Sequence, residues 1–355
     1  MKRLKNLSKT TKSNFITYAM VMAAYILVQI LIQTGSLSSQ MQGLLVPLCI
    51  YSILAVSLNL TVGILGELSL GHAGFMCVGA FSGSIFSVCM KGVIASDGLR
   101  FFLALLIGAV VAGIFGILIG IPVLRLRGDY LAIVTLAFGE IIKTVINAVY
   151  VGKDSKGFHF SLENVMALNL EPDGQVIIKG AQGISGTPKD STFTIGVILL
   201  LITLVIVLNL IYSRGGRAIM AIRDNRIAAE SVGINITKYK IMAFSISAAL
   251  AGLAGVLYSH NLSTLTATSK NFGYNQSIMI LVFVVLGGMG NIRGSVISAV
   301  ILTLLPELLR GLQDYRMLIY SIVLIAMMIF NWSPKIKVWR ESHPFFKKKN
   351  QKEEA

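Results

Sequence analysis

A few ionisable and amide side chains lie within long apolar stretches, where each polar group needs a partner or a function. Glu140, Lys143 and Asn147 follow one another three and four residues apart, so on a helix they share one face. Such a polar stripe could line a pathway through a membrane. Glu140 and Lys143 could equally neutralise each other and hold neighbouring helices together, because a pair at this spacing needs no substrate to explain it.

A second polar group opens the stretch LGELSLGHAGFMCVGAFSG at Leu65–Gly83, where Glu67 and His72 precede unevenly spaced glycines. The glycines suit either close helix packing or a helix that breaks, so that its backbone groups face a substrate. Glu67 and His72 could also lie in water at the cytoplasmic end. The candidate residues of a translocation pathway are therefore Glu67, His72, Glu140, Lys143 and Asn147.

Enzyme motifs are absent from the sequence, which contains no GxxxxGK[ST], HExxH, CxxC or GxSxG pattern. The four histidines are scattered without metal-ligand spacing, and the three cysteines lie in apolar stretches. We therefore expect a protein that is not an enzyme and that holds no cofactor or metal of its own. A carrier or a channel is favoured.

The composition indicates the solvent in which these residues lie. Hydrophobic residues make up 55% of the 355 residues and charged residues 13%, whereas soluble domains average about 25% charged residues. A chain this apolar cannot bury its hydrophobic side chains in one aqueous core and still cover its outside. The composition disfavours a soluble enzyme, a disordered chain and a disulfide scaffold, and it predicts an all-α polytopic membrane protein.

A helical crossing needs about 20 apolar residues, and about ten stretches offer them. Gly71–Met90 is doubtful because it is rich in small residues, and Ser277–Gly290 and Ser295–Leu309 are short and separated by a glycine-rich turn. Either region could be a broken or re-entrant helix buried in protein. The predicted stretches are Phe15–Gln33, Met41–Gly63, Gly71–Met90, Phe101–Leu124, Tyr130–Val151, Phe193–Tyr212, Ile241–Ser259, Ser277–Gly290, Ser295–Leu309 and Met317–Trp332.

The net charge of +15 would suggest nucleic acid in a soluble protein. Here about two thirds of the 31 basic residues fall on one side when both termini are cytoplasmic, as the positive-inside rule requires. No nucleic-acid partner is therefore expected. No A-x-A site follows the first stretch, which favours an uncleaved span over a signal peptide.

The predicted organisation is a basic cytoplasmic arm (1–14), a transmembrane domain (15–332) and a basic cytoplasmic tail (333–355). Within the transmembrane domain, 152–192 is an external loop that forms either a small β-containing cap around Gln175–Lys179 or a polar connector.

The cytoplasmic loop 213–240 reads SRGGRAIMAIRDNRIAAESVGINITKYK. Arg217–Asp224 and Ile227–Val232 are compatible with helices, and Asn225 and Gly233 are natural breaks. The loop has an apolar and a charged side, so it could lie on lipid or dock in the groove of a partner, and its mixed charge favours a protein partner. Its candidate coupling residues are Arg217, Ile219, Arg223, Asp224, Arg226, Ala228, Ala229, Glu230 and Gly233.

This loop resembles the cytoplasmic EAA-type loop of bacterial ABC importer permeases in the arrangement of Ala228, Ala229 and Gly233, with Ile227 in place of the family's Glu. Longer stretches are similar to the M-type permease subunits of branched-chain amino-acid importers, although the segment 147–180 is longer than usual for that family. These stretches are Leu58–Phe81, Leu126–Lys143, Gly183–Pro188, Gly216–His260 and Val284–Arg310.

The resemblance implies ATP-driven import across the bacterial plasma membrane. It implies an H-type second permease subunit, two ATP-binding subunits that hold ATP and Mg, and an extracytoplasmic solute-binding protein that delivers Leu, Ile or Val. Closure of the ATPases would push on the coupling loop. Urea, short amides and nucleosides remain alternative cargoes, and a permease homodimer remains possible. An ion-coupled carrier or channel without ATPase partners also remains, in which Glu140 is the only acidic residue deep enough for coupling.

Overall fold

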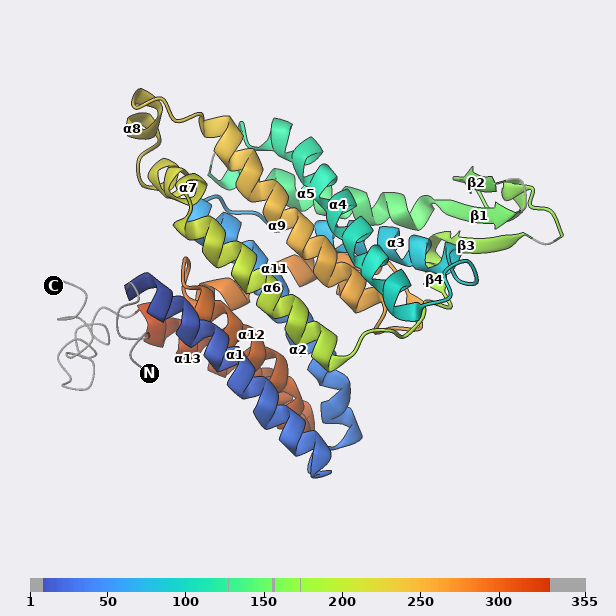
Figure 1. Ribbon diagram of the computed structural model, residues 1–355, viewed down its shortest axis with the longest axis horizontal. Coiled ribbons are helices and arrows are strands. Elements are labelled where there is room, and N and C mark those ends of the chain that lie inside the picture. The colour runs from blue at the N-terminus through green and yellow to red at the C-terminus, as the bar shows by residue number, and fades with distance from the viewer. Residues whose placement is uncertain (1–8, 127, 155–156, 173, 333–355) are drawn as a thin grey trace.

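The computed structural model describes residues 9–332 apart from 127, 155–156 and 173 (Figure 1). The predicted tail and most of the predicted basic arm lie outside the described residues. The helices that build the molecule are α1 Lys9–Gln33, α2 Ser39–Asn59, α3 His72–Cys89, α4 Asp97–Val123, α5 Asp129–Ala148, α6 Phe193–Tyr212, α7 Arg214–Asp224, α8 Arg226–Ser231, α9 Ile236–Ser259, α10 Ser269–Phe272, α11 Tyr274–Gly287, α12 Ile292–Leu308 and α13 Arg316–Trp332.

Each of the ten predicted stretches contains a helix, although Tyr130–Val151 overruns α5 into a strand. Among the described residues, eight helices are long and apolar enough to cross a membrane. The doubt about Ser277–Gly290 is justified, since α11 has only 14 residues, which span about 21 Å. The stretch Gly71–Met90, in contrast, is not a broken helix, because α3 runs through it without interruption. The helical backbone is interrupted before α3, between Leu65 and His72.

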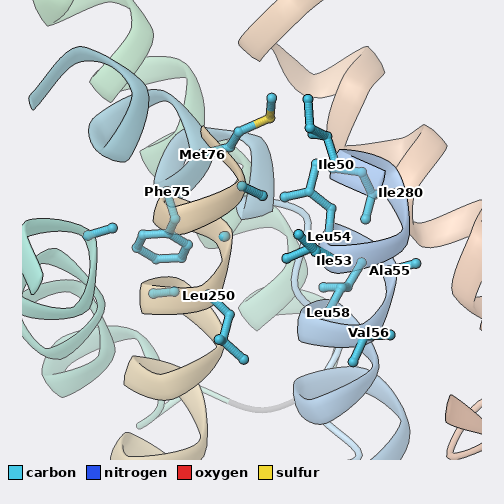
Figure 2. Packing of buried hydrophobic residues seen from close by; sticks show 14 of the residues in the cluster. Ile50, Ile53, Leu54, Ala55, Val56, Leu58, Phe75, Met76, Leu250 and Ile280 are labelled. Carbon is cyan, nitrogen blue, oxygen red and sulfur yellow. The ribbon is translucent and has the colours of Figure 1, made fainter. Parts of the chain in front are cut away.

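The centre of the bundle is α2, which packs against α6, α9 and α12. Its side chains Ile50, Ile53 and Leu54 are fully buried. Figure 2 shows them directed into a cluster shared with Met76 of α3 and Leu250 of α9. In contrast, α1 and α13 lie at the edge of the bundle (Figure 1) and expose many apolar side chains, as helices facing lipid do.

Small residues let α9 pack closely against α3 and α4. A Cβ added at Gly79 of α3 would overlap the backbone of Gly252 in α9, and one at Gly116 of α4 would lie 2.6 Å from Ala248. These small residues therefore hold this chain's own helices together, and dispersion contacts at close backbone approach stabilise the bundle.

A five-stranded antiparallel sheet of order β2-β1-β3-β4-β5 follows α5. In its centre, Val151 lies opposite Phe160 on one side and Ile178 on the other. Of the two alternatives for the external loop, the structure favours the β-containing one, since Gln175–Lys179 forms β3, and the sheet adds β structure to an otherwise helical fold. It lies at the end of the bundle opposite α7 and α8 (Figure 1). The strands are β1 Tyr150–Asp154, β2 Gly157–Ser161, β3 Gln175–Lys179, β4 Ile184–Ser185 and β5 Thr264–Leu265.

Candidate functional site

The loop between α6 and α9 folds into an elbow of two short helices, α7 and α8. Ser213 caps α7 by accepting a hydrogen bond from the Gly216 amide at 3.1 Å. Asn225 ends α7 and caps α8, because its Oδ1 accepts from the Ala228 amide at 3.0 Å. Gly233 follows with φ +83°, a left-handed conformation that favours glycine. Both predicted breaks in this loop are confirmed.

One face of the elbow is buried and positions it on the bundle. Ile219, Ile222 and Ala229 are buried, and Ile222 and Ala229 form a small cluster with Ile236 at the start of α9. Two of the predicted coupling residues, Ile219 and Ala229, therefore position the elbow and are closed to a partner. Arg217 donates to the Tyr212 carbonyl at 3.3 Å, which satisfies a free carbonyl at the end of α6.

The other face forms a tip that is open to a partner. The apolar side chains Ile227 and Val232 are 81% and 75% exposed. The apolar side that the sequence predicts for this loop is therefore divided between Ile219, which is buried, and Ile227, which is exposed. The exposed Val232 was not singled out from the sequence. The sequence signal for the exposure of Ile227 and Val232 is that each is an isolated aliphatic residue in a short segment too polar to be buried on every side. Asp224, Ala228, Glu230 and Gly233 are also exposed at the tip, and Arg226 is half-buried.

Arg223 does not belong to this tip alone, because its guanidinium also reaches back into the transmembrane domain. Its Nη1 donates to the Gly63 carbonyl at 3.1 Å, while Nε and Nη2 donate to Asp224. The aliphatic part of Arg223 crosses Gly66, where an added Cβ would lie 2.6 Å from the Arg223 Cγ. Arg223 therefore joins the elbow to the chain that follows α2.

That chain is a buried π-helix, Leu60–Leu65, which ends at Gly66 with φ +79°. Irregular backbone at membrane depth is tolerated where protein surrounds it, and π-helical turns are frequent at functional sites. Glu67 follows and forms an ion pair with Lys240 of α9. The Glu67 side chain is 17% exposed and that of Lys240 4%, so the structure excludes the alternative in which Glu67 lies in open water. The two opposite charges compensate each other where neither is fully hydrated.

His72 is also not in water, because it is buried at the start of α3. Its Nε2 lies 2.8 Å from Ser57 Oγ, and that hydroxyl donates its proton to the Leu54 carbonyl. A hydroxyl has one proton to give, so the His72 ring donates to Ser57. His72 thus joins α3 to α2 as a satisfied core residue.

The polar stripe of α5 meets the segment that leads into α11. Glu140 and Lys143 form the expected ion pair. Lys143 Nζ also donates to Ser269 Oγ at 2.9 Å, and Glu140 Oε1 accepts from the Tyr274 amide at 2.7 Å. Asn147 Nδ2 donates to the Ala267 carbonyl at 2.8 Å.

All three predicted stripe residues therefore tether α5 to the chain at 267–274. The Glu140 side chain is 29% exposed and that of Lys143 12%, so solvent still reaches this ion pair.

Comparison with known proteins supplies the family. Residues 40–331 match the family described as branched-chain amino acid transport system, permease component. The chain is 35% identical over 297 residues to the high-affinity branched-chain amino acid transport system permease protein LivM of Salmonella typhimurium, covering 81% of this chain and 67% of the relative. The LivM protein of Escherichia coli is 34% identical over the same shares.

The ribose import permease protein RbsC of Escherichia coli is 28% identical over 272 residues, covering 70% of this chain and 82% of the relative. No solved structure matches the chain. The match spans the π-helix, the elbow and the α5 stripe, so the features described above all lie within the shared region. The chain therefore belongs to the family of branched-chain amino acid transport permeases.

Proposed function

We propose that this chain is the membrane-spanning permease subunit of an ATP-driven importer in the bacterial plasma membrane, and that it translocates Leu, Ile and Val. The observation that carries the proposal is the elbow of α7 and α8, which leaves a small tip open at one end of a bundle that matches LivM relatives over 81% of its length. The substrate follows from those relatives, which are named for branched-chain amino acids.

The expected partners divide between the two ends of the bundle. Two ATP-binding subunits, which hold ATP and Mg, are expected at the elbow, and an extracytoplasmic solute-binding protein at the end that carries the sheet (Figure 1). A second permease subunit of H type is expected beside this one, since LivH permeases are also similar to the chain, at 24% identity. In this arrangement the chain itself catalyses no reaction and holds no cofactor.

The elbow suits a helix-in-groove contact with an ATP-binding subunit. Ile227 and Val232 offer two apolar anchors, and the Arg223–Asp224 ion pair, Arg226 and Glu230 add charges of both signs beside them. Such anchors gain most of their binding energy when a partner removes them from water. The complementary groove on the ATPase is therefore apolar at its centre and polar at its rim. Movement of that groove reaches the bundle through the buried face of the elbow and through Arg223.

We place the translocation pathway along α5 where it faces the segment 267–274. Glu140 and Lys143 are the partly exposed charged pair there, and Asn147 continues the stripe. Glu67 and His72 do not line the pathway directly but hold the helices around it. Glu67, in the segment before α3, pairs with Lys240 of α9, and His72 of α3 bonds to Ser57 of α2. An amino acid carries one positive and one negative group, so a compensated pair presents no net charge to repel it.

The same class of importer with another cargo is the main alternative. Fructose and ribose import permeases are similar to the chain at 26% and 28% identity, and urea, amides and nucleosides remain open. An ion-coupled carrier is less well supported, because its coupling would need a carboxylate free to exchange an ion. Glu140 is instead held by Lys143 and by the Tyr274 amide.

Co-purification tests the class of transporter. The tagged chain is expressed together with the proteins encoded beside it in the genome. It is then extracted in mild detergent and analysed by native mass spectrometry. We expect a complex with two ATP-binding subunits and a second permease. Recovery of the chain alone from every detergent, with transport activity retained in liposomes, would exclude an ATP-driven importer.

A further inference from the structure

The end of α2 is joined to the turn between α11 and α12 by one buried side chain. Asn59 is fully buried, its Oδ1 accepts from the Gly290 amide at 2.8 Å, and its Nδ2 donates to Ser295 Oγ at 2.8 Å. The two contacts cross 231 and 236 positions of sequence. A single amide side chain thus satisfies one backbone group and one hydroxyl on the facing hairpin.

The π-helix brings the coupling elbow to the same point. The Gly63 carbonyl accepts from Arg223 of α7. On its other side Gly63 touches the hairpin turn, since an added Cβ there would overlap Gly290 and the Asn59 amide. Gly63 therefore lies between the elbow and the hairpin with no side chain to separate them.

The hairpin can move as one body and reaches the α5 stripe. Gly287 of α11 and Gly294 of α12 are in such close contact that a Cβ on either would overlap the other. At its far end, α11 begins with Tyr274, whose amide holds Glu140. A displacement of the turn at Gly290 is thereby carried along α11 to the residues that we place on the pathway.

We propose that Asn59 is a positioning residue that passes movement of α7 to the α11–α12 hairpin, and that the π-helix Leu60–Leu65 is the element that shifts. This inference rests on the proposed function. A π-helical turn holds one residue more than an α-helical turn, so a change between the two pairings rotates Gly63 relative to the hairpin. Such a two-state element is what a coupling route requires physically.

Double electron–electron resonance on the assembled complex tests the route. Nitroxides are placed at Arg214 at the start of α7, Met289 in the hairpin turn and Leu118 on α4 as a reference, all of them exposed positions. The buried Cys49, Cys77 and Cys89 are replaced by Ala. In the otherwise unchanged complex, ATP with vanadate is expected to shift both the 214–118 and the 289–118 distances.

The Asn59→Ala variant separates the two movements. It removes both hydrogen bonds to the hairpin, so we expect the 214–118 distance to shift as before and the 289–118 distance to stay fixed. Leucine transported per ATP hydrolysed should fall in this variant, because the hairpin no longer follows the movement of α7. Thr203→Ala is the matched control: Thr203 is equally buried, but its hydroxyl donates to the Leu199 carbonyl of its own helix.

Each outcome decides between the claims. A 289–118 shift that persists in Asn59→Ala overturns the role of Asn59. An unchanged 214–118 distance in the labelled complex that keeps Asn59 contradicts the proposed function itself. Should Asn59→Ala fail to assemble, Asn59→Leu fills a similar volume and also removes both hydrogen bonds, and a 289–118 shift of full size in that variant overturns the inference as well.

Discussion

The ion pair between Glu67 and Lys240 gives a sharp test of how the chain tolerates charge inside the bundle. The Lys240→Met variant keeps the aliphatic volume and removes the ammonium group. It leaves the Glu67 carboxylate with 17% exposure and no opposite charge from α9. Removing one partner of a buried pair costs about 3–5 kcal/mol. The partial exposure of Glu67 places the expected loss of unfolding free energy near the lower end, about 3 kcal/mol.

The second variant removes the carboxylate as well. Glu67→Gln combined with Lys240→Met leaves no uncompensated charge, and replacing a whole buried pair is often close to neutral. We therefore expect the double variant to recover most of the loss, to within about 1 kcal/mol of the parent. Lys238→Met is the matched control, because Lys238 lies on the same helix but is exposed, and its replacement should change stability by about 0.5 kcal/mol at most.

Equilibrium unfolding by SDS in mixed micelles, followed by tryptophan fluorescence, measures these free energies. Equal midpoints for Lys240→Met and Lys238→Met would refute the assignment of a buried, mutually dependent pair. A double variant as unstable as Lys240→Met would show that the ammonium group stabilises the fold through other contacts.

Three further outcomes follow from the elbow and the bundle. Arg223→Glu and Gly233→Trp should each leave membrane insertion intact and uncouple ATP hydrolysis from uptake. The first places a carboxylate against the Gly63 carbonyl, and the second strains a backbone at φ +83°. Normal uptake in both variants would contradict the role of the elbow. Ile227→Asp should abolish co-purification of the ATP-binding subunits, whereas Leu162→Asp, equally exposed at the sheet end, should not. Gly79→Val should prevent α3 from packing on α9 and lower the yield of folded protein, measured by size-exclusion chromatography.

The sequence predicts the helices well because each crossing needs a long apolar run, and such runs are visible one at a time. It also predicts the breaks at Asn225 and Gly233, since capping and left-handed backbone are local properties of those residue types.

The contacts that join these elements were not predictable. Glu67 pairs with a lysine 173 positions away, and Arg223 reaches a carbonyl 160 positions away. No local pattern encodes either partner, so a position of Glu67 and His72 in water stayed open as an alternative, and the contact of Arg223 with the transmembrane domain was not predicted. Asn59 was not singled out at all. Its only signal is an amide within a long apolar stretch.

Reconstituted transport tests the central claim most directly. Proteoliposomes containing the full complex, supplied with the solute-binding protein outside and ATP inside, are assayed for uptake of radiolabelled leucine. We predict uptake that requires ATP and the binding protein and that isoleucine and valine compete with. Uptake by this chain alone, driven by an ion gradient and indifferent to ATP, would contradict the account.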